Sequence, residues 1–139
     1  MLVDLEPDDP RWAVVLPVLQ ELRPHLTGEL LAQVLDEGGR QGLRFTALFE
    51  HHRCVAVAGW RVVANTGSIR KLYVDDLSTA AADRSHGHGA SLLAALTQRG
   101  RDLGCATIEL DSGVERHDAH RFYLRERMVI SAHHFRKPC

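Results

Sequence analysis

A glycine-containing segment in the second half of the sequence has the composition of an anion-binding turn. It reads Arg84-Ser85-His86-Gly87-His88-Gly89, and a leucine-rich helical pattern follows it directly. Glycines allow a ligand to approach the backbone closely, and the free N–H groups that open a helix attract anions. Arg84 can add a bidentate contact to phosphate. The segment therefore predicts a phosphate-binding turn. The alternative is that the Gly-x-Gly only forms a tight turn between a strand and a helix and binds no ligand.

Two common phosphate-binding motifs do not fit this segment. A P-loop requires Gly-Lys-Ser/Thr, which the sequence lacks. A dinucleotide-binding fingerprint requires a third glycine where Leu92 stands, and no parallel βαβ unit begins the chain. What remains is an Arg-x-x-Gly-x-Gly turn between a strand and a helix.

Two neighbouring carboxylates lie in the apolar stretch before this turn. Asp75 and Asp76 are candidates for chemistry because a buried carboxylate is costly unless it is used. Simple alternation along a strand puts them on opposite faces, so one at most points into a site. Asp76, nearer the strand end, is the preferred general base, and Asp111 is the rival. Either can instead steer a cationic amine, or bond a loop backbone as strand-end aspartates do.

The nine histidines raise the question of a metal site. His117-x-x-His120 is a pair without a third ligand at a known spacing, and His133 and His134 point to opposite faces of a strand. We therefore expect no metal, although a small metal-binding protein is a rival interpretation. Cys105 has no adjacent base, which disfavours it as a covalent nucleophile.

The hydrophobic periodicity predicts a mixed α/β (α+β) architecture in the order β-α-α-β-β-β-α-β-α-β. The predicted helices cover 10–22, a segment capped by Thr27 and stopped by Gly38, a segment following Gly89 and ended by Gly104, and 117–126. The predicted strands cover 2–5, 43–49, 54–63, 68–79, 107–110 and 128–135. The three middle strands are separated by short turns and predict an antiparallel meander within a mixed, mostly antiparallel sheet flanked by helices.

Length and composition limit the number of domains, the class of binding partner and the cellular compartment. The chain has 139 residues, of which 45% are hydrophobic and 25% charged, and we interpret residues 1–139 as a single domain. A net charge of -1 argues against a nucleic-acid or membrane-surface binder, and no apolar run is long enough for a membrane helix. The three cysteines include no Cys-x-x-Cys, which is typical of a reducing cytoplasm.

Two segments together resemble the GNAT superfamily of N-acetyltransferases. LSTAAADRSHGHGASLL resembles the acyl-CoA-binding motif, and HDAHRFYLRERM resembles the superfamily's second helix, with Ala119 four residues before Tyr123. The predicted element order agrees over nearly the whole chain. The resemblance implies a GNAT-type fold and acetyl-CoA as co-substrate. It also implies that these residues bind acetyl-CoA: Leu77, Ser78, Thr79, Arg84, Ser85, His86, Gly87, His88, Gly89 and Ala90.

The resemblance also implies the chemistry. We expect an acetyl group to pass directly from acetyl-CoA to a primary amine, with Tyr123 as general acid for the departing thiolate and Asp76 as base. A core tyrosine beside Phe122 is the structural alternative for Tyr123. A small amine acceptor is expected, and an edge strand over Ile130–Phe135 could pair two copies. The main alternative is a non-catalytic CoA-binding sensor or interaction module.

Two positions depart from the family pattern. Arg127 stands where a glycine is usual, four residues after the tyrosine, and Arg116 replaces a frequent asparagine seven residues before it. If the first position requires a positive φ, Arg127 is strained or the turn differs.

Overall fold

The computed structural model describes residues 1–139. The chain divides into a first unit, Met1–Glu109, and a second unit, Leu110–Cys139. None of the helices combines the length with the apolar composition that a membrane span requires.

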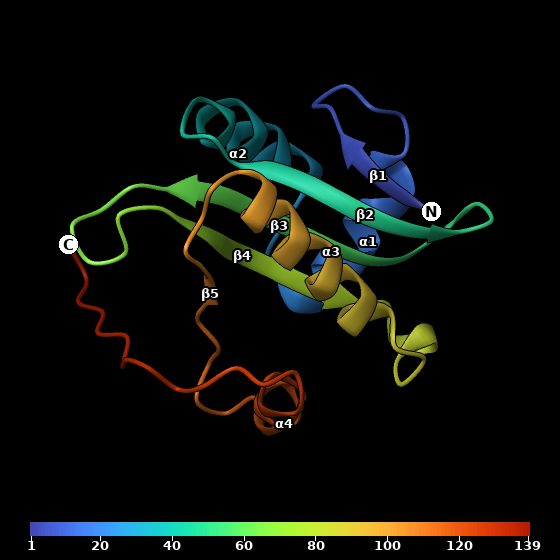
Figure 1. Ribbon diagram of the computed structural model, residues 1–139. Helices are drawn as coiled ribbons and strands as arrows, with labels where there is room; N and C mark the ends of the chain where they lie inside the picture. Colours follow the sequence, from blue (N-terminus) through green and yellow to red (C-terminus); the bar gives the residue numbers. More distant parts are fainter. The chain divides into compact units, whose positions relative to one another are not determined.

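A five-stranded sheet organises the first unit, with the strands in the order β1-β2-β3-β4-β5 (Figure 1). The strands are β1 (Leu2–Leu5), β2 (Arg44–Glu50), β3 (Arg53–Val63), β4 (Lys71–Thr79) and β5 (Thr107–Leu110). The first four pair antiparallel with their neighbours. The predicted meander is therefore confirmed. Helix α3 (His88–Asp102) connects β4 to β5 as a crossover, the connection that parallel neighbours require.

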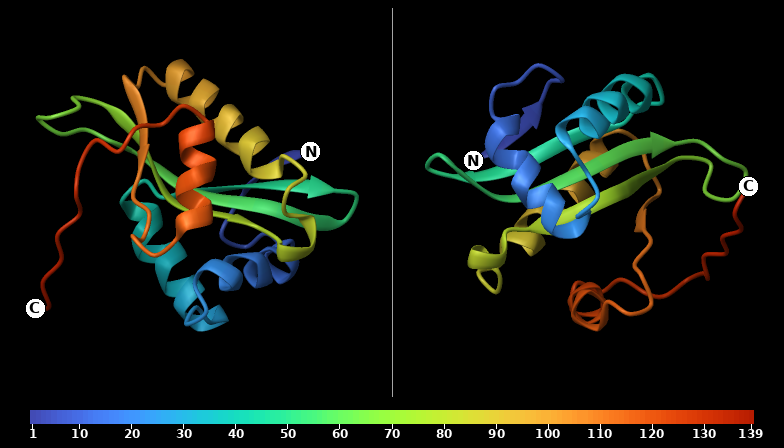
Figure 2. Two further views of the ribbon diagram at one scale, coloured as in Figure 1. Left: turned by 90° about the horizontal axis from the view of Figure 1, so that it is seen from below. Right: turned by 180° about the vertical axis from the view of Figure 1, so that it is seen from behind.

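Helices cover both faces of this sheet. Helix α3 lies on one face, and α1 (Trp12–Leu22) and α2 (Gly28–Arg40) lie on the other (Figure 2). The apolar side of α3 buries Leu92, Leu93 and Leu96, whose spacing is that of one helix face. The core on the opposite face gathers Trp12, Val15, Val18, Leu19, Leu31, Phe45 and Phe49. Packing on both faces fixes the position of the central strands. The turn from Arg84 to Ala90, called the glycine turn below, follows the last of these strands, β4.

The N-terminus of α2 agrees with the sequence prediction, and the N-terminus of α1 differs from it. Thr27 caps α2 as predicted, because its Oγ1 accepts a hydrogen bond from the Leu30 N–H at 3.2 Å. Helix α1 begins at Trp12 rather than at Pro10, and Arg11 is its N-cap. Asp9 Oδ1 accepts hydrogen bonds from the Arg11 N–H at 2.8 Å and from Arg11 Nε at 2.9 Å, and these bonds close the turn before the helix.

Helix α2 does not stop at Gly38, which corrects the sequence prediction. It continues to Arg40, and Gly42, with φ of 85°, follows its C-cap. Gly38 is buried, and a Cβ there would lie 2.8 Å from Leu43 Cδ2. This glycine therefore permits close packing of the returning chain, while Gly42 provides the left-handed residue that ends the helix.

The last predicted strand is wrong. Residues 128–135 form no strand, and the chain has five strands rather than six. Val129, Ile130 and Phe135 are exposed. Apolar and β-branched residues favour a strand only where a neighbouring strand completes the ladder, and this segment has none.

The second unit contains α4 (His117–Arg125), which agrees with the predicted helix. The helix ends in a Schellman motif: the Met128 N–H donates to the Tyr123 carbonyl at 3.0 Å, and the Arg127 N–H donates to the Leu124 carbonyl at 3.1 Å. Arg127 has a φ of 64°, so this position does adopt the left-handed conformation that the usual glycine serves. The helix therefore ends with a strained, non-glycine residue at this position.

Replacing Arg127 with glycine is expected to stabilise the protein. Glycine reaches a positive φ without the Cβ clash, and we expect a gain of about 0.5–1 kcal/mol in the free energy of unfolding. Urea denaturation measures this change. Arg127→Ala is the control, since alanine retains the clash and should not gain stability. A destabilised Arg127→Gly variant would show that the arginine side chain contributes more than the strain costs.

Candidate active site

The glycine turn begins after a short 3-10 helix, Ala81–Asp83, and opens α3. Gly87 is the N-cap of α3, with φ of 79°, and no side chain caps the helix. The N–H groups of the first helical residues, His88, Gly89 and Ala90, have no carbonyl partner within the helix. Ser85 also has a positive φ, 66°. The turn therefore presents main-chain donors at the positive end of the α3 dipole, the arrangement that binds phosphate.

Contacts from three elements hold this turn at the end of β4. The Ala80 N–H donates to the Val55 carbonyl at 3.0 Å, and the Ala81 N–H donates to Glu21 Oε2 at 2.8 Å. Arg84 Nε reaches the Thr79 carbonyl at 3.5 Å, while its guanidinium lies 3.8 Å from Glu21. Arg84 is exposed and makes only these long contacts, so its side chain can turn toward an anion.

The end of β4 is paired on one side only. Leu77, Ser78 and Thr79 pair with β3, and Ser78 Oγ donates to the Val18 carbonyl at 2.8 Å, which ties β4 to α1. On the other side, β5 lies beside the start of β4, where the Ala106 N–H donates to the Arg70 carbonyl at 2.9 Å. A four-residue strand extends for about 13 Å and the nine-residue β4 for about 30 Å, so β5 cannot reach Leu77–Thr79. That backbone edge has no strand partner and can therefore pair with a ligand.

A β-bulge in β4 overturns the expected orientation of its two aspartates. Gly59 pairs with Asp76 and Trp60 pairs with Val74, so Asp75 is an extra residue in the strand. Asp75 accepts two hydrogen bonds from Arg61, whose guanidinium also contacts Gln41 at the end of α2. Asp76 bonds Arg23 at the end of α1. Both carboxylates thus meet side chains on the α1/α2 side of the sheet, and the prediction of opposite faces is wrong.

Arg23 is a site residue that the sequence analysis missed. Its Nε donates to Asp76 Oδ1 at 2.9 Å, and its Nη2 donates to the Asp75 carbonyl at 3.1 Å. Burial raises the pKa of Asp76, and the hydrogen bond and positive charge of Arg23 oppose that rise. No local pattern identifies Arg23, because its partners lie about fifty residues away along the chain.

Tyr123 lies in the second unit, on α4. Burial raises the pKa of its hydroxyl above the usual 10, and the charge and hydrogen bond of Arg116 oppose that rise. Arg116 is the residue that replaces the family's asparagine, so the substitution places a cation beside the tyrosine. Asp111, the rival base, lies in the same unit, with His134 Nδ1 at 3.0 Å from its Oδ2.

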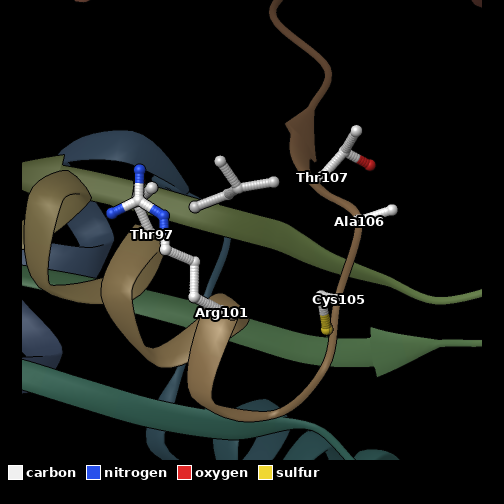
Figure 3. Close-up of a pocket in the computed structure, with 7 residues that line it drawn as sticks. Thr97, Arg101, Cys105, Ala106 and Thr107 are labelled. Carbon is white, nitrogen blue, oxygen red and sulfur yellow. The ribbon is translucent and has the colours of Figure 1, made fainter.

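A cavity of about 190 Å³ lies at the far end of α3, away from the glycine turn (Figure 3). Its walls come from Thr97, Gly100, Arg101, Cys105, Ala106, Thr107 and Ile108. None of the candidate site residues lines it. Cys105 is partly exposed there. Cys54 is buried, and this burial raises the pKa of its thiol to about 11. At that pKa the Cys54 thiol is not a nucleophile near neutral pH.

Comparison with known proteins identifies the family. A family model described as "Acetyltransferase (GNAT) family" matches residues 11–127. The chain is 33% identical over 129 residues to a protein of Bacillus subtilis (strain 168) named "Uncharacterized N-acetyltransferase YhdJ", which covers 91% of each chain. This chain therefore belongs to the GNAT family of acetyltransferases, an acetyl-CoA-dependent family of enzymes.

Solved structures show the same fold at lower identity. A putative acetyltransferase from Agrobacterium tumefaciens str. C58 matches with a TM-score of 0.83 and 22% identity, over 100% of this chain and 99% of that one. An aminoglycoside N-acetyltransferase, AAC(6')-Iy, in complex with CoA matches with a TM-score of 0.80 and 14% identity, over 100% and 95%. The expected α+β GNAT-type fold is thereby confirmed.

Proposed function

We propose that the protein transfers an acetyl group from acetyl-CoA to a primary amine of a small acceptor, in a direct reaction within a ternary complex. The observation that carries the proposal is the uncapped N-terminus of α3, which follows the open backbone edge of Leu77–Thr79. The turn from Arg84 to Ala90 would hold the diphosphate of CoA. The backbone of Leu77–Thr79 would pair with the pantetheine arm, whose amides can complete a strand edge.

The reaction needs a neutral amine. An amine with a pKa near ~10 is mostly protonated at neutral pH, so a base must take its proton before or during attack. We assign this role to Asp76. The amine nitrogen then attacks the thioester carbon, the C–S bond breaks, and the departing sulfur takes a proton from Tyr123. The new amide nitrogen loses its second proton to the Tyr123 phenolate, which restores the phenol.

The proton transfer from Tyr123 is uphill in water. A phenol with a pKa of ~10 binds its proton more tightly than a thiol with a pKa of ~8.5, by a free energy of about 2 kcal/mol. Burial of Tyr123 enlarges this difference, and the nearby Arg116 reduces it by stabilising the phenolate. Arg116 thus favours the general-acid role at a position where the family more often has a neutral residue.

The charge pattern near Asp76 supports an amine acceptor. Asp75 and Asp76 bring two carboxylates to the same side of the sheet, each paired with one arginine. An incoming ammonium group can replace Arg23 as the partner of Asp76, and the half-exposed Arg23 can exchange its bonds to Asp76 and the Asp75 carbonyl for water. A cationic small molecule is therefore the acceptor class that we propose.

The pH dependence of the reaction should report the Arg23–Asp76 pair. Asp76 acts only when deprotonated, and Arg23 lowers a pKa that burial raises. Removing Arg23 therefore raises the pKa of Asp76 further, and the acidic limb of the kcat/KM profile of Arg23→Gln should move to higher pH. Arg40→Gln removes an exposed ion pair with Asp36 and serves as the control. An unshifted limb in Arg23→Gln would remove Asp76 from the mechanism.

Thiol release from acetyl-CoA across a library of small amines tests the proposed function. A transferase releases CoA thiol only with a suitable acceptor. The alternative, a CoA-binding sensor, predicts that acetyl-CoA binds and that no amine in the library releases thiol.

A further inference from the structure

Three metal-ligating side chains converge beside the glycine turn. Asp83, His86 and His88 each offer one ligand atom, and these atoms all lie within 4.8 Å of one another. They come from one short segment with the pattern Asp-x-x-His-x-His. A short segment loses little entropy when its ligands close around an ion. The sequence analysis considered the histidines without Asp83, because the 3-10 helix that turns Asp83 toward them has no clear sequence signal.

The environment of Asp83 prepares it for coordination. The residue is buried, and its Oδ1 accepts a hydrogen bond from Arg53 Nη2 at 2.7 Å. The other carboxylate oxygen has no such bond and is available to an ion. Metal-binding carboxylates are commonly held by hydrogen bonds of this kind, which orient them.

The two histidines differ in exposure. The His88 side chain is largely buried, and its Nε2 lies 3.6 Å from Glu50 Oε1, which adds a second negative charge at this place. His86 is exposed and lies between Ser85 and Gly87, both at positive φ. The two imidazole centroids are 6.0 Å apart. His86 can therefore turn toward Asp83 and His88 without disturbing the core.

We propose that Asp83, His86 and His88 form a binding site for a divalent transition-metal ion such as Zn²⁺. Ligand atoms around tetrahedral zinc are roughly 3.3 Å apart, so atoms that lie within 4.8 Å of one another need to close by about 1.5 Å at most. Two imidazoles with one carboxylate favour zinc, nickel or copper over magnesium or calcium, which prefer oxygen ligands. Three protein ligands leave one coordination position open.

Calorimetric titration of the full chain, carrying no histidine tag, with zinc chloride tests this site. We expect one ion per chain at micromolar affinity, and His86→Asn and His88→Asn each to weaken binding by about 10-fold or more. Asp83→Asn should weaken it as well, but the two histidine variants decide the outcome if the loss of the Arg53 pair unfolds that variant. The absence of binding at micromolar zinc, or binding unchanged in both histidine variants, would overturn the proposal.

Two other histidine variants are the matched controls. His51→Asn removes an exposed histidine at a φ of 56°, a conformation that asparagine tolerates, and it should bind zinc like the unmodified protein. His117→Asn breaks the other close histidine pair, whose centroids are 6.1 Å apart, and should also leave binding unchanged. A loss confined to His117→Asn would place the ion elsewhere. The zinc titrations contain no acetyl-CoA, so they test this site independently of the proposed function.

Discussion

Tyr123→Phe is expected to lower kcat by about 10²–10⁴-fold, the usual contribution of a positioned general acid. Phenylalanine retains the ring and its packing but has no proton to give to the departing thiolate. The dissociation constant of acetyl-CoA should change by no more than about twofold, because the hydroxyl acts on the transition state rather than on the bound substrate. Steady-state kinetics together with calorimetric titration separate the two quantities.

The other tyrosine supplies the matched control for this experiment. Tyr73 lies on β4 beside Lys71, whose Nζ is 5.7 Å from the ring centroid, and we assign it no part in the reaction. Tyr73→Phe should keep kcat within about threefold of the unmodified protein. If Tyr123→Phe loses acetyl-CoA affinity and turnover equally, Tyr123 is a packing residue and the general acid is another group.

Asp76→Asn is expected to lower kcat by about 10²-fold or more, because the amide cannot accept the proton of the acceptor amine. The amide retains the size of the side chain and can still accept the Arg23 hydrogen bond. The acidic limb of the pH profile that belongs to Asp76 should disappear with the carboxylate. Kinetics at saturating acetyl-CoA, measured across pH with an active amine, test both effects.

Asp75→Asn is the control for Asp76. Asp75 is the bulged neighbour on the same strand and pairs with Arg61 instead of Arg23. Its substitution should change kcat by less than about threefold. An equal loss in both variants would mean that the two carboxylates act through the bulge or through their shared charge, and that Asp76 is not a specific base.

The parts of the fold that the sequence predicted correctly depend on local patterns. Alternation and chain turns predicted β1 and the β2-β3-β4 meander, and Thr107–Leu110 matches β5 residue for residue. Helical spacing and Gly104 located α3. Each of these signals lies within the element that it describes, so one sequence is enough to detect it.

The features that the sequence could not predict depend on distant partners. The bulge at Asp75 results from the β3–β4 register, which sets two residues against one. The Arg23–Asp76 pair joins the end of α1 to β4. Asp83 is an exception: its histidine partners are close along the chain, but the 3-10 helix that places it beside them has no clear sequence signal. The predicted strand over 128–135 is wrong because a partner is missing: its composition favours a strand, but no neighbouring strand pairs with it.

We infer that the main-chain donors opening α3 bind the diphosphate of acetyl-CoA. Calorimetric titration of the protein with acetyl-CoA tests this inference. The proposal predicts one binding site per chain with micromolar affinity, and displacement of acetyl-CoA by free CoA. An absence of binding at high micromolar acetyl-CoA would contradict it.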